Sequence, residues 1–462
     1  MYNCKYPEMS QTLRKRKSAK SGLTIFGRCH IKYFEYFYMV VMVVYMAQMT
    51  NDTGRMIGGL SGNPIPLLIP IVLTLVLLSR NHIGWKNSRL WLVLGVTSLW
   101  SVLSLAKYGG FTNTEELSYI FFLYYAIVIA YIHAQVFGST IFPIYEHILV
   151  WVCKVDLVFW AFNIMFYSLP ELVGIFPETN LGRNILYVYQ WITPDLNIYD
   201  NAILRNAGFS WEPGRFAIMI VLAIYVNLSR RGVTFVKNSN IVWLLLALAS
   251  TQSTTGFSLA IFLLVVFYLK RFSFKRMLIF TIIFIPAIVY ISTLDFMKKK
   301  IEEQLDVKES VMVLEQSFNY TNRTDASDEY YGSLDRFSAI YFETDNFLHD
   351  FWLGYGRNTE HSYFYTNVTS HFVLTGGIMK TFGQYGILMG LFIYILLAIS
   401  SIRITKDFKG KRRIALFVVI MLASISYVTW CVPIFTTFWL YGSFSPDNNK
   451  KKKIKYAAVK TK

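Results

Sequence analysis

The first of two arginine-containing segments holds side chains whose types and spacing suit anion binding. It reads LRNAGFSWEPGRFAIMI and contains Arg205, Glu212 and Arg215, the last two separated by Pro213 and Gly214. A proline near a helix start is geometrically favoured, and a helix N-terminus presents unpaired N–H groups and a positive dipole end. The segment therefore predicts a helix that begins near Pro213 and would hold an anion beside the two arginines.

A second segment begins near Arg336 and contains a predicted turn at Gly354 and Gly356. It reads GSLDRFSAIYFETDNFLHDFWLGYGRNTEHSYF. The apolar residues after the arginine have the spacing of an amphipathic helix that lies on a membrane surface. They are Phe337, Ile340, Tyr341, Phe347 and Leu348. Because a planar guanidinium binds phosphate oxygens in a bidentate fork, arginines delivered by two segments to one water–lipid boundary suit a lipid pyrophosphate.

Ordinary ion pairing is the alternative for the arginines of this region. Residues 295–370 carry 14 of the chain's 28 acidic residues against seven basic ones. Arg323, Arg336 and Arg357 therefore have many acidic neighbours in the sequence.

Two histidines and a run of hydroxyl side chains complete the candidates. His361 and His371 are of the residue type most easily recruited as a general base near neutral pH, although a lone histidine more often makes an ordinary surface hydrogen bond. The run ASTQSTTGFSLA predicts either a tight helical hairpin whose Ser and Thr satisfy backbone groups, or the floor of a glycan site lined by Ser253, Thr254 and Gly256.

Apolar helices must position these residues. Of the 462 residues, 54% are hydrophobic and only 16% are charged, and about 20 apolar residues in a helix span roughly 30 Å of hydrocarbon. The sequence therefore predicts an all-α polytopic membrane protein with one transmembrane domain at 33–445. The predicted helices lie near 33–49, 64–79, 90–105, 117–133, 148–168, 216–228, 241–251, 256–269, 277–294, 383–402, 414–431 and 433–444. Splitting the last apolar run at Pro433 gives twelve helices, and leaving it whole gives eleven.

The distribution of basic residues predicts the sidedness of these helices. The net charge of +17 suggests nucleic acid at first sight, but the Lys and Arg residues cluster between apolar blocks, as in cytoplasmic loops, and form no nucleic-acid face. Residues 1–32 and the tail 446–462 are expected to be basic cytoplasmic arms. Two long loops, 169–215 and 295–370, then face outside, where function is expected. The four cysteines predict neither a disulfide framework nor a metal cluster.

Taken together, these segments resemble the O-antigen polymerase and O-antigen ligase family of membrane glycosyltransferases. The resemblance rests on Arg205 before the segment Gly208-Phe209-x-x-Glu212-Pro213, and on the Ser253-x-x-Gly256 hairpin. It continues with Arg336, the aromatic-rich run, the Gly354-x-Gly356 turn and the final KTFGQYGILMGL, and covers roughly residues 200–400 in order.

The resemblance implies a family C glycosyltransferase-like fold in a bacterial inner membrane, with the active site facing the periplasm. It implies undecaprenyl-pyrophosphate-linked glycans as donor and acceptor, and neither a metal nor another cofactor. Arg205 and Arg215 correspond to a first anion clamp and Arg336 to its partner, with His361, its rival His371, or Glu212 taking the acceptor proton. A chain-length regulator is an expected partner.

Three functions remain open from the sequence. The ligase pattern of His followed by Asn is His361-Ser362 here, which favours a polymerase of oligosaccharide repeats over a ligase that transfers glycan to a lipid core. A flippase for the same lipid-linked sugars is the alternative of a different class. Transporters usually show repeat symmetry and ionisable residues at mid-membrane, and the polar residues of this chain gather instead in its outer loops.

Overall fold

The computed structural model is mostly helical. It describes residues 22–25, 29–46, 65–81, 83–108, 114–166, 178–179, 182–185, 188–192, 204–210, 212–233, 238–268, 332–333, 336–368, 372–374, 377–427, 430 and 432–446. Of the described residues, 78% are helical, which confirms the helical fold class. The predicted helix 277–294, most of the arm 1–32 and the tail beyond residue 446 lie outside the described residues.

Every other predicted helix falls on an observed one. The helices are α1 (Tyr33–Val40), continued by η2 (Val41–Tyr45), α3 (Ile65–Arg80), α4 (Ser88–Tyr108), α5 (Thr114–Val136), η4 (Gly138–Thr140), α6 (Ile141–Met165), α7 (Pro213–Arg231), α8 (Ser239–Ser250), α9 (Thr254–Tyr268), α13 (Arg336–His349), η7 (Thr359–His361), η8 (Phe364–Val368), α14 (Gly377–Asp407), α15 (Ala415–Ala423) and α16 (Pro433–Phe444). The helix start predicted near Pro213 and the amphipathic helix predicted from Arg336 are both present.

The start of α6 lies seven residues before the predicted start at residue 148. Glu146 and His147 interrupt the apolar run that guided the prediction, yet α6 begins at Ile141 and includes both. Glu146 is fully buried, pairs with Arg230 at 2.5 Å and accepts a hydrogen bond from the Asn227 amide at 2.7 Å. A buried charge is tolerated inside a helix when it is paired and hydrogen-bonded.

Three helices are long and apolar enough to cross a membrane: Ser88–Tyr108, Gly138–Met165 and Gly377–Asp407. The large apolar side chains that these helices leave exposed, such as Leu99, Trp151 and Leu388, face away from the bundle. A helix that is apolar on its outer face suits lipid as its surroundings. The count of twelve spans and the family C fold stay predictions.

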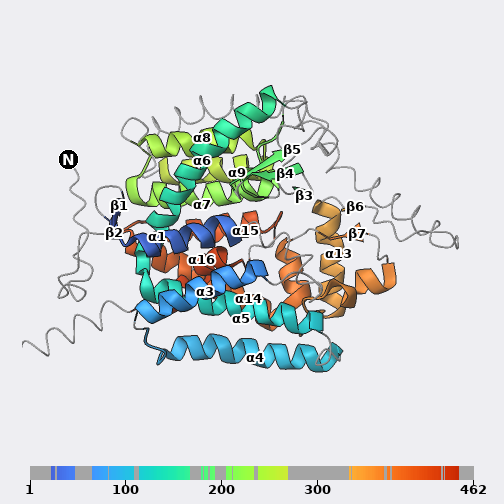
Figure 1. The fold of residues 1–462 in the computed structure, drawn as a ribbon. Helices are drawn as coiled ribbons and strands as arrows, with labels where there is room; N and C mark the ends of the chain where they lie inside the picture. Colours follow the sequence, from blue (N-terminus) through green and yellow to red (C-terminus); the bar gives the residue numbers. More distant parts are fainter. Residues whose placement is uncertain are drawn as a thin grey trace, which may run out of the picture.

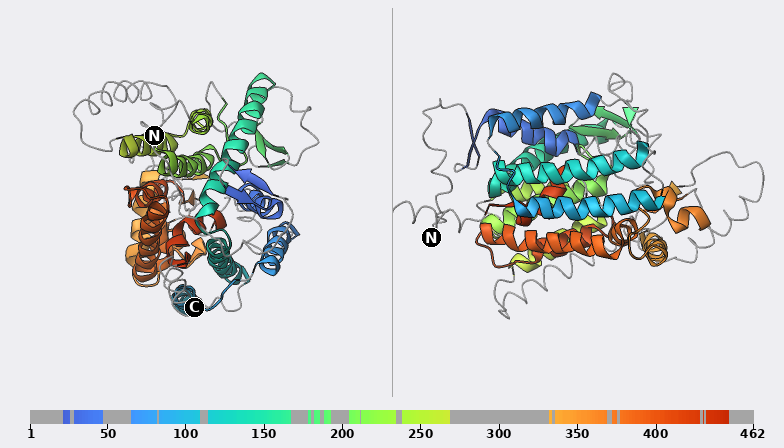
Figure 2. Two further views of the ribbon diagram at one scale, coloured as in Figure 1. Left: turned by 90° about the vertical axis from the view of Figure 1, so that its left-hand side faces the viewer. Right: turned by 90° about the horizontal axis from the view of Figure 1, so that it is seen from below.

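The core of the bundle is formed by α16 and α7. Every residue of α16 is buried, as are all the residues of α7 from Phe216 to Leu228. A helix that is apolar all round is stable only when neighbours surround it. In the end-on view of Figure 2, α16 lies within the ring of the other helices.

Basic side chains mark one end of the bundle. Arg80 of α3 lies over the Phe34 ring, Tyr36 of α1 bonds His147 of α6, and Arg230 pairs with the adjacent Glu146. Helices α3 and α7 therefore end where α1 and α6 begin, on the left in Figure 1.

Short strands, which the sequence analysis did not predict, lie at both ends. β1 (Leu23–Ile25) and β2 (Cys29–Ile31) form a hairpin at the basic end, and β3 (Glu178–Thr179), β4 (Gly182–Ile185) and β5 (Tyr189–Ile192) form an antiparallel sheet at the other end. β6 (Gly332–Ser333) pairs in parallel with β7 (Phe372–Val373). The Asn163 side chain bonds both backbone groups of Ile192, which fixes β5 against α6.

Helix α14 is interrupted at Gly386, and we call this interruption the break. Gly386 has a φ of 67° and a ψ of −179°, so a short helical segment, 377–385, precedes a long one, 387–407. The loop 351–356 fills the break and satisfies its backbone groups. The bonds run from Tyr355 N–H to Gly383 O at 2.8 Å, from Gly356 N–H to Gln384 O at 3.1 Å, and from Ile387 N–H to Phe351 O at 2.8 Å.

Gly386 cannot be replaced without strain. Its positive φ disfavours any residue with a Cβ atom, and a Cβ built there would overlap the backbone carbonyl of Trp352. We expect Gly386→Ala to lower the free energy of unfolding by roughly 2–4 kcal/mol. Thermal unfolding of the purified protein in detergent would show this as a melting temperature lower by several degrees.

Gly95→Ala is the matched control for this substitution. Gly95 lies inside α4 with no heavy atom within 4 Å of an added Cβ, and alanine is favoured over glycine in a helix by about 1 kcal/mol. Its melting temperature should equal or exceed that of the wild type. Equal melting temperatures for the two variants would contradict the assigned role of Gly386.

Candidate functional site

The loop 204–210, which carries Arg205, is bound to the turn between α8 and α9. Arg205 is 5% exposed, and its Nε donates a hydrogen bond to the Thr251 carbonyl at 3.1 Å. The backbone N–H of Asn206 donates to the Ser250 carbonyl at 2.9 Å, and its amide donates to the Ser250 hydroxyl at 2.9 Å. The position of Arg205 is therefore fixed by backbone contacts of α8.

The other side of this loop is held by β5 and α6. Gln190 N–H donates to the Gly208 carbonyl at 2.7 Å, and the Trp160 indole donates to the Leu204 carbonyl at 2.8 Å. Gly208 has a φ of 55°, and a Cβ at this position would lie 2.5 Å from the Phe216 ring. The glycine before Phe209 is therefore required by both the turn and the close packing of α7.

The start of α7 brings Glu212 and Arg215 together with a residue from a distant helix. Glu212 is the N-cap in an extended conformation, and Pro213 is the first helical residue. The Tyr427 hydroxyl donates a hydrogen bond to the Glu212 carboxylate. Both Glu212 and Tyr427 act electrostatically on the Arg215 guanidinium. Gly214 is required here because a Cβ would overlap the Tyr427 hydroxyl.

Three helix N-termini meet at the turn formed by residues Ser424–Tyr427, which we call the 424–427 turn. α7 reaches it through Glu212 and Tyr427, and α9 reaches it through a hydrogen bond of 2.8 Å between the Thr255 and Ser426 hydroxyls. α14 reaches it at Gly377, where a Cβ would overlap the Ser424 carbonyl. Helix N-termini carry partial positive charge, which Arg215 reinforces in the first turn of α7, whereas α15, whose C-cap is Ser424, brings partial negative charge to the same turn.

The hydroxyl run forms the helical hairpin that the sequence allowed. The Thr251 hydroxyl donates to the Leu248 carbonyl at 2.7 Å, and the Ser253 hydroxyl accepts the Gly256 N–H at 3.2 Å. Thr254 is the first residue of α9. Gly256 is buried where α9 packs on α7, with a built Cβ 2.7 Å from that of Ala217. Among the predicted lining residues, Gly256 therefore lies in a helix contact and not on an open surface.

The predicted residues of the second loop gather at the end of α4. The ring of His361 stacks on the ring of Tyr108 with centroids 4.5 Å apart and planes 9° apart. The Tyr108 hydroxyl bonds the Asp350 carboxylate at 3.2 Å and the Gly354 carbonyl at 3.0 Å, and Lys107 pairs with Asp350. A Cβ at Gly356 would lie 3.2 Å from the Ser104 hydroxyl, so this glycine allows close approach to α4, whereas a Cβ at Gly354 would overlap the backbone of Gln384 in α14.

Sequence reasoning missed Lys107, Tyr108 and Asp350. Lys107 follows a long apolar block, and a charged residue at such a boundary reads as an ordinary helix end. Its partner Asp350 lies 243 residues away. Only the fold brings them together.

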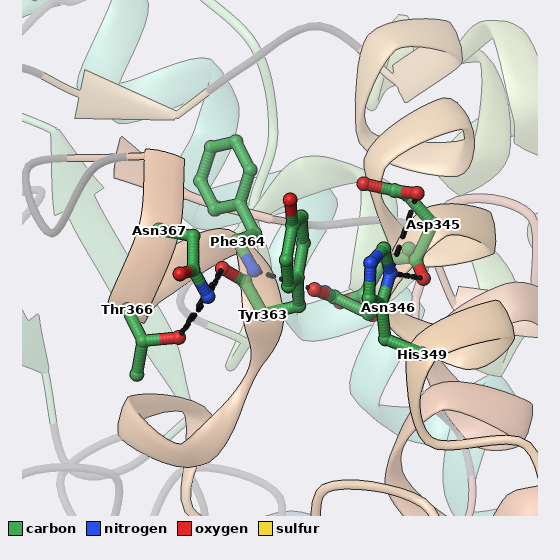
Figure 3. A network of polar contacts seen from close by, with 8 residues as sticks. Asp345, Asn346, His349, Tyr363, Phe364, Thr366 and Asn367 are labelled. Atoms are coloured by element: carbon green, nitrogen blue, oxygen red, sulfur yellow. Dashed lines mark hydrogen bonds and ion pairs between the residues drawn. The ribbon is translucent and has the colours of Figure 1, made fainter.

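Figure 3 shows how α13 holds the segment that follows His361. The Asn346 side chain accepts the Phe364 N–H at 2.7 Å. The His349 ring stacks on Tyr363 with centroids 3.6 Å apart, and its Nδ1 lies 3.0 Å from the Asp345 carbonyl. The position of η8 thus depends on α13.

The candidate residues form two groups at the same end of the bundle. The first group lies at the start of α7 and at the α8–α9 turn, and the second group lies at the end of α4. The short segment of α14 joins them: Gly377 lies on the 424–427 turn, and Gln384 lies at the 354–356 turn. Seven residues of helix span roughly 10 Å. Arg336 begins α13, but its side chain lies outside what the structure describes, as does all of His371.

Comparison with known proteins identifies no relative: no protein-family model and no curated protein matches this chain. Within the described ranges, no group of three or more His, Cys, Asp or Glu side chains could hold a metal ion. The site must therefore be interpreted from its own side chains.

The bond between Tyr427 and Glu212 should contribute measurably to stability. A hydrogen bond to a charged group contributes about 1.5–3 kcal/mol, so Tyr427→Phe should lower the free energy of unfolding by an amount in that range. Glu212→Ala combined with Tyr427→Phe should cost less than the two single losses added, because each substitution alone removes the same bond. Chemical unfolding in detergent measures the unfolding free energy of each variant.

Tyr341→Phe provides the comparison for this loss, since Tyr341 is 69% exposed on α13. Its unfolding free energy should stay within about 0.5 kcal/mol of the wild type. If Tyr427→Phe is equally harmless, Tyr427 does not link α7 to the 424–427 turn.

Proposed function

We propose that this protein joins lipid-linked oligosaccharide repeats at the outer face of a bacterial inner membrane, acting as a metal-independent polymerase of surface polysaccharide. The observation that carries the proposal is the meeting of three helix N-termini at the 424–427 turn, with Arg215 in the first turn of α7 and the Arg205 loop bound to the turn between α8 and α9. The donor and acceptor would be undecaprenyl-pyrophosphate-linked glycans.

Arginines and helix N-termini are suited to the charge of such a donor. A guanidinium binds phosphate oxygens in a bidentate fork, and helix N-termini add unpaired N–H groups. In the proposed reaction an acceptor hydroxyl oxygen forms a bond to the anomeric carbon, and the bond from that carbon to the pyrophosphate oxygen breaks. The electron pair leaves on the lipid pyrophosphate, whose developing charge Arg205 and Arg215 would stabilise. Arg336 would add a third guanidinium from α13.

The acceptor hydroxyl must also lose its proton. Glu212 lies beside Arg215 and accepts a hydrogen bond from the Tyr427 hydroxyl, so its carboxylate is already engaged by two neighbouring groups. His361 stacks on Tyr108 in the other group, and its imidazole is of the residue type most easily recruited as a general base. Because the two groups are roughly two helical turns apart, we assign pyrophosphate binding to the first and acceptor binding to the second.

A transporter of the same lipid-linked sugars is the second candidate, and one residue favours it. Asp156 lies fully buried in α6, a helix long enough to cross a membrane, and among the described residues neither of its carboxylate oxygens has a hydrogen-bond partner. Buried ionisable groups in membrane helices mark ion or substrate pathways in many transporters. A ligase would share the proposed site and differ only in its acceptor.

Deletion of the gene, followed by complementation, tests the site. The surface polysaccharide of the deletion strain should run on a gel as single repeats on the lipid core, and the wild-type gene should restore the ladder. Arg205→Ala and Arg336→Ala should not restore it. Arg205→Lys should restore only short ladders, because lysine keeps the charge but loses the fork and the Nε bond to Thr251.

Arg413→Ala is the control, since Arg413 is an exposed arginine near the C-terminal end of α14. It should give the full ladder at equal protein level. Normal ladders from both Arg205→Ala and Arg336→Ala would overturn the site. Long polymer left on the carrier lipid of the deletion strain would identify a ligase instead.

Asp156→Asn separates the polymerase from the transporter. Asparagine has the same shape but cannot ionise, so in a polymerase this variant should leave the ladder intact. In a transporter it should abolish surface glycan of every length, single repeats included, while Arg205→Ala leaves the ladder unchanged. Gels of the two variants, run side by side with equal membrane levels of protein, give the answer.

A further inference from the structure

Helix α13 presents an acidic side chain to the interior of the protein. Glu343 is 1% exposed, whereas Tyr341 and Leu348 on the outer face of the same helix are 69% and 63% exposed. The Tyr355 hydroxyl lies 3.3 and 3.2 Å from the two Glu343 oxygens, and the Asn346 amide lies 3.2 Å from one of them. The carboxyl group is therefore enclosed by a tyrosine of the 351–356 loop and an amide of its own helix.

The contact between Glu343 and Tyr355 lies directly over the break in α14. Tyr355 donates its backbone N–H to the Gly383 carbonyl at 2.8 Å, as part of the bonding that fills the break. A Cβ built at Gly383 would lie 2.9 Å from a Glu343 oxygen and 2.9 Å from the Tyr355 ring. Glu343, Tyr355 and Gly383 thus form one packed contact between α13, the loop and α14.

Burial raises the pKa of Glu343 to about 7. Lys380 on α14 opposes the shift through its charge, and the hydrogen bonds from Asn346 and Tyr355 oppose it as well. Burial and the neighbouring carboxylate together raise the pKa of Tyr355 well above its ordinary value, so this tyrosine stays neutral. Tyr108 and Tyr385 are the titratable groups that face Tyr355 from α4 and α14.

We propose that Glu343 positions the 351–356 loop in the break of α14, and that ionisation of Glu343 loosens this contact so that the outer end of the bundle opens. Glu343 is a positioning residue in this scheme, because its burial keeps it away from any ligand. The proposal does not rest on the function proposed above, and its test needs no activity.

The direction of the pH effect follows from the two states. In the opened state the carboxyl group meets water and titrates near its ordinary value of 4.5. The closed state therefore has its full stability below about 4.5 and loses it as the pH rises through about 7. For these two pKa values the opening equilibrium increases about tenfold between pH 6 and pH 8 and levels off above.

The opening also changes access to the second group of candidate residues. Gly354 and Gly356 belong to the loop that Tyr355 anchors. The Gly354 carbonyl accepts a hydrogen bond from the Tyr108 hydroxyl, and the His361 ring is stacked on the Tyr108 ring. Release of the loop from the break would therefore expose Tyr108 and His361 together.

Hydrogen exchange of the full-length protein in lipid nanodiscs tests the proposal. The measured exchange rates are first corrected for the intrinsic pH dependence of exchange. For peptides that cover residues 339–356 and 383–390, the equilibrium constant of opening should then rise about tenfold from pH 6 to pH 8. Glu343→Gln should remove this rise, since glutamine fills the same space and does not titrate. Glu360→Gln, at an exposed carboxylate of the same region, should keep it.

Tyr355→Phe gives a second, independent measurement. Loss of the hydroxyl removes a hydrogen bond that lowers the pKa of Glu343, so the rise should move to higher pH without disappearing. If Glu343→Gln does not fold, the pH profiles of Tyr355→Phe and the wild type still test the proposal. A flat wild-type profile, an unshifted profile in Tyr355→Phe, or an unchanged rise in a folded Glu343→Gln would each overturn the proposal.

Discussion

The filled break in α14 is the constraint on which the candidate site depends. A helix that stops inside an apolar bundle leaves backbone groups that must find partners, because an unpaired N–H or carbonyl away from water costs several kcal/mol. Here the partners come from a loop, 351–356, and not from a neighbouring helix. The loop and the break are therefore stable only together.

This mutual dependence fixes the geometry of everything at that end of the bundle. The short segment of α14 ends at the break, so its other end must lie on the 424–427 turn, where α7 and α9 also begin. The loop that fills the break carries Gly354 against Tyr108 and so places His361. The two groups of candidate residues are thus held at a fixed separation by one short piece of helix.

The sequence predicted the helices well because apolar blocks of membrane length are a strong signal, and it predicted the start of α7 because Pro213 has a clear local meaning. The break was not predictable in this way. In FGQYGILMG, Gly386 reads like any small residue of a helix, and its conformation is decided by a loop about 30 residues earlier. The partners Tyr427 of Glu212 and Asp350 of Lys107 were missed for the same reason, since they lie 215 and 243 residues away.

The two faces of α13 show that the meaning of an amphipathic pattern depends on whether water or lipid surrounds the helix. The amphipathic spacing predicted the helix, but Tyr341 and Leu348 face outward while Glu343 and Asn346 face inward. In water such an arrangement would leave apolar area exposed at about 25 cal/mol per Å² and would also bury a carboxyl group. Against lipid the apolar cost vanishes. The exposed Trp352 and Leu388 continue the same surface on either side of the break, so the outer face of α13 joins the apolar face of a membrane-length helix. A polar inner face is consistent with this arrangement, because Glu343 and Asn346 find hydrogen-bond partners in Tyr355 and Phe364 on the inner side of α13.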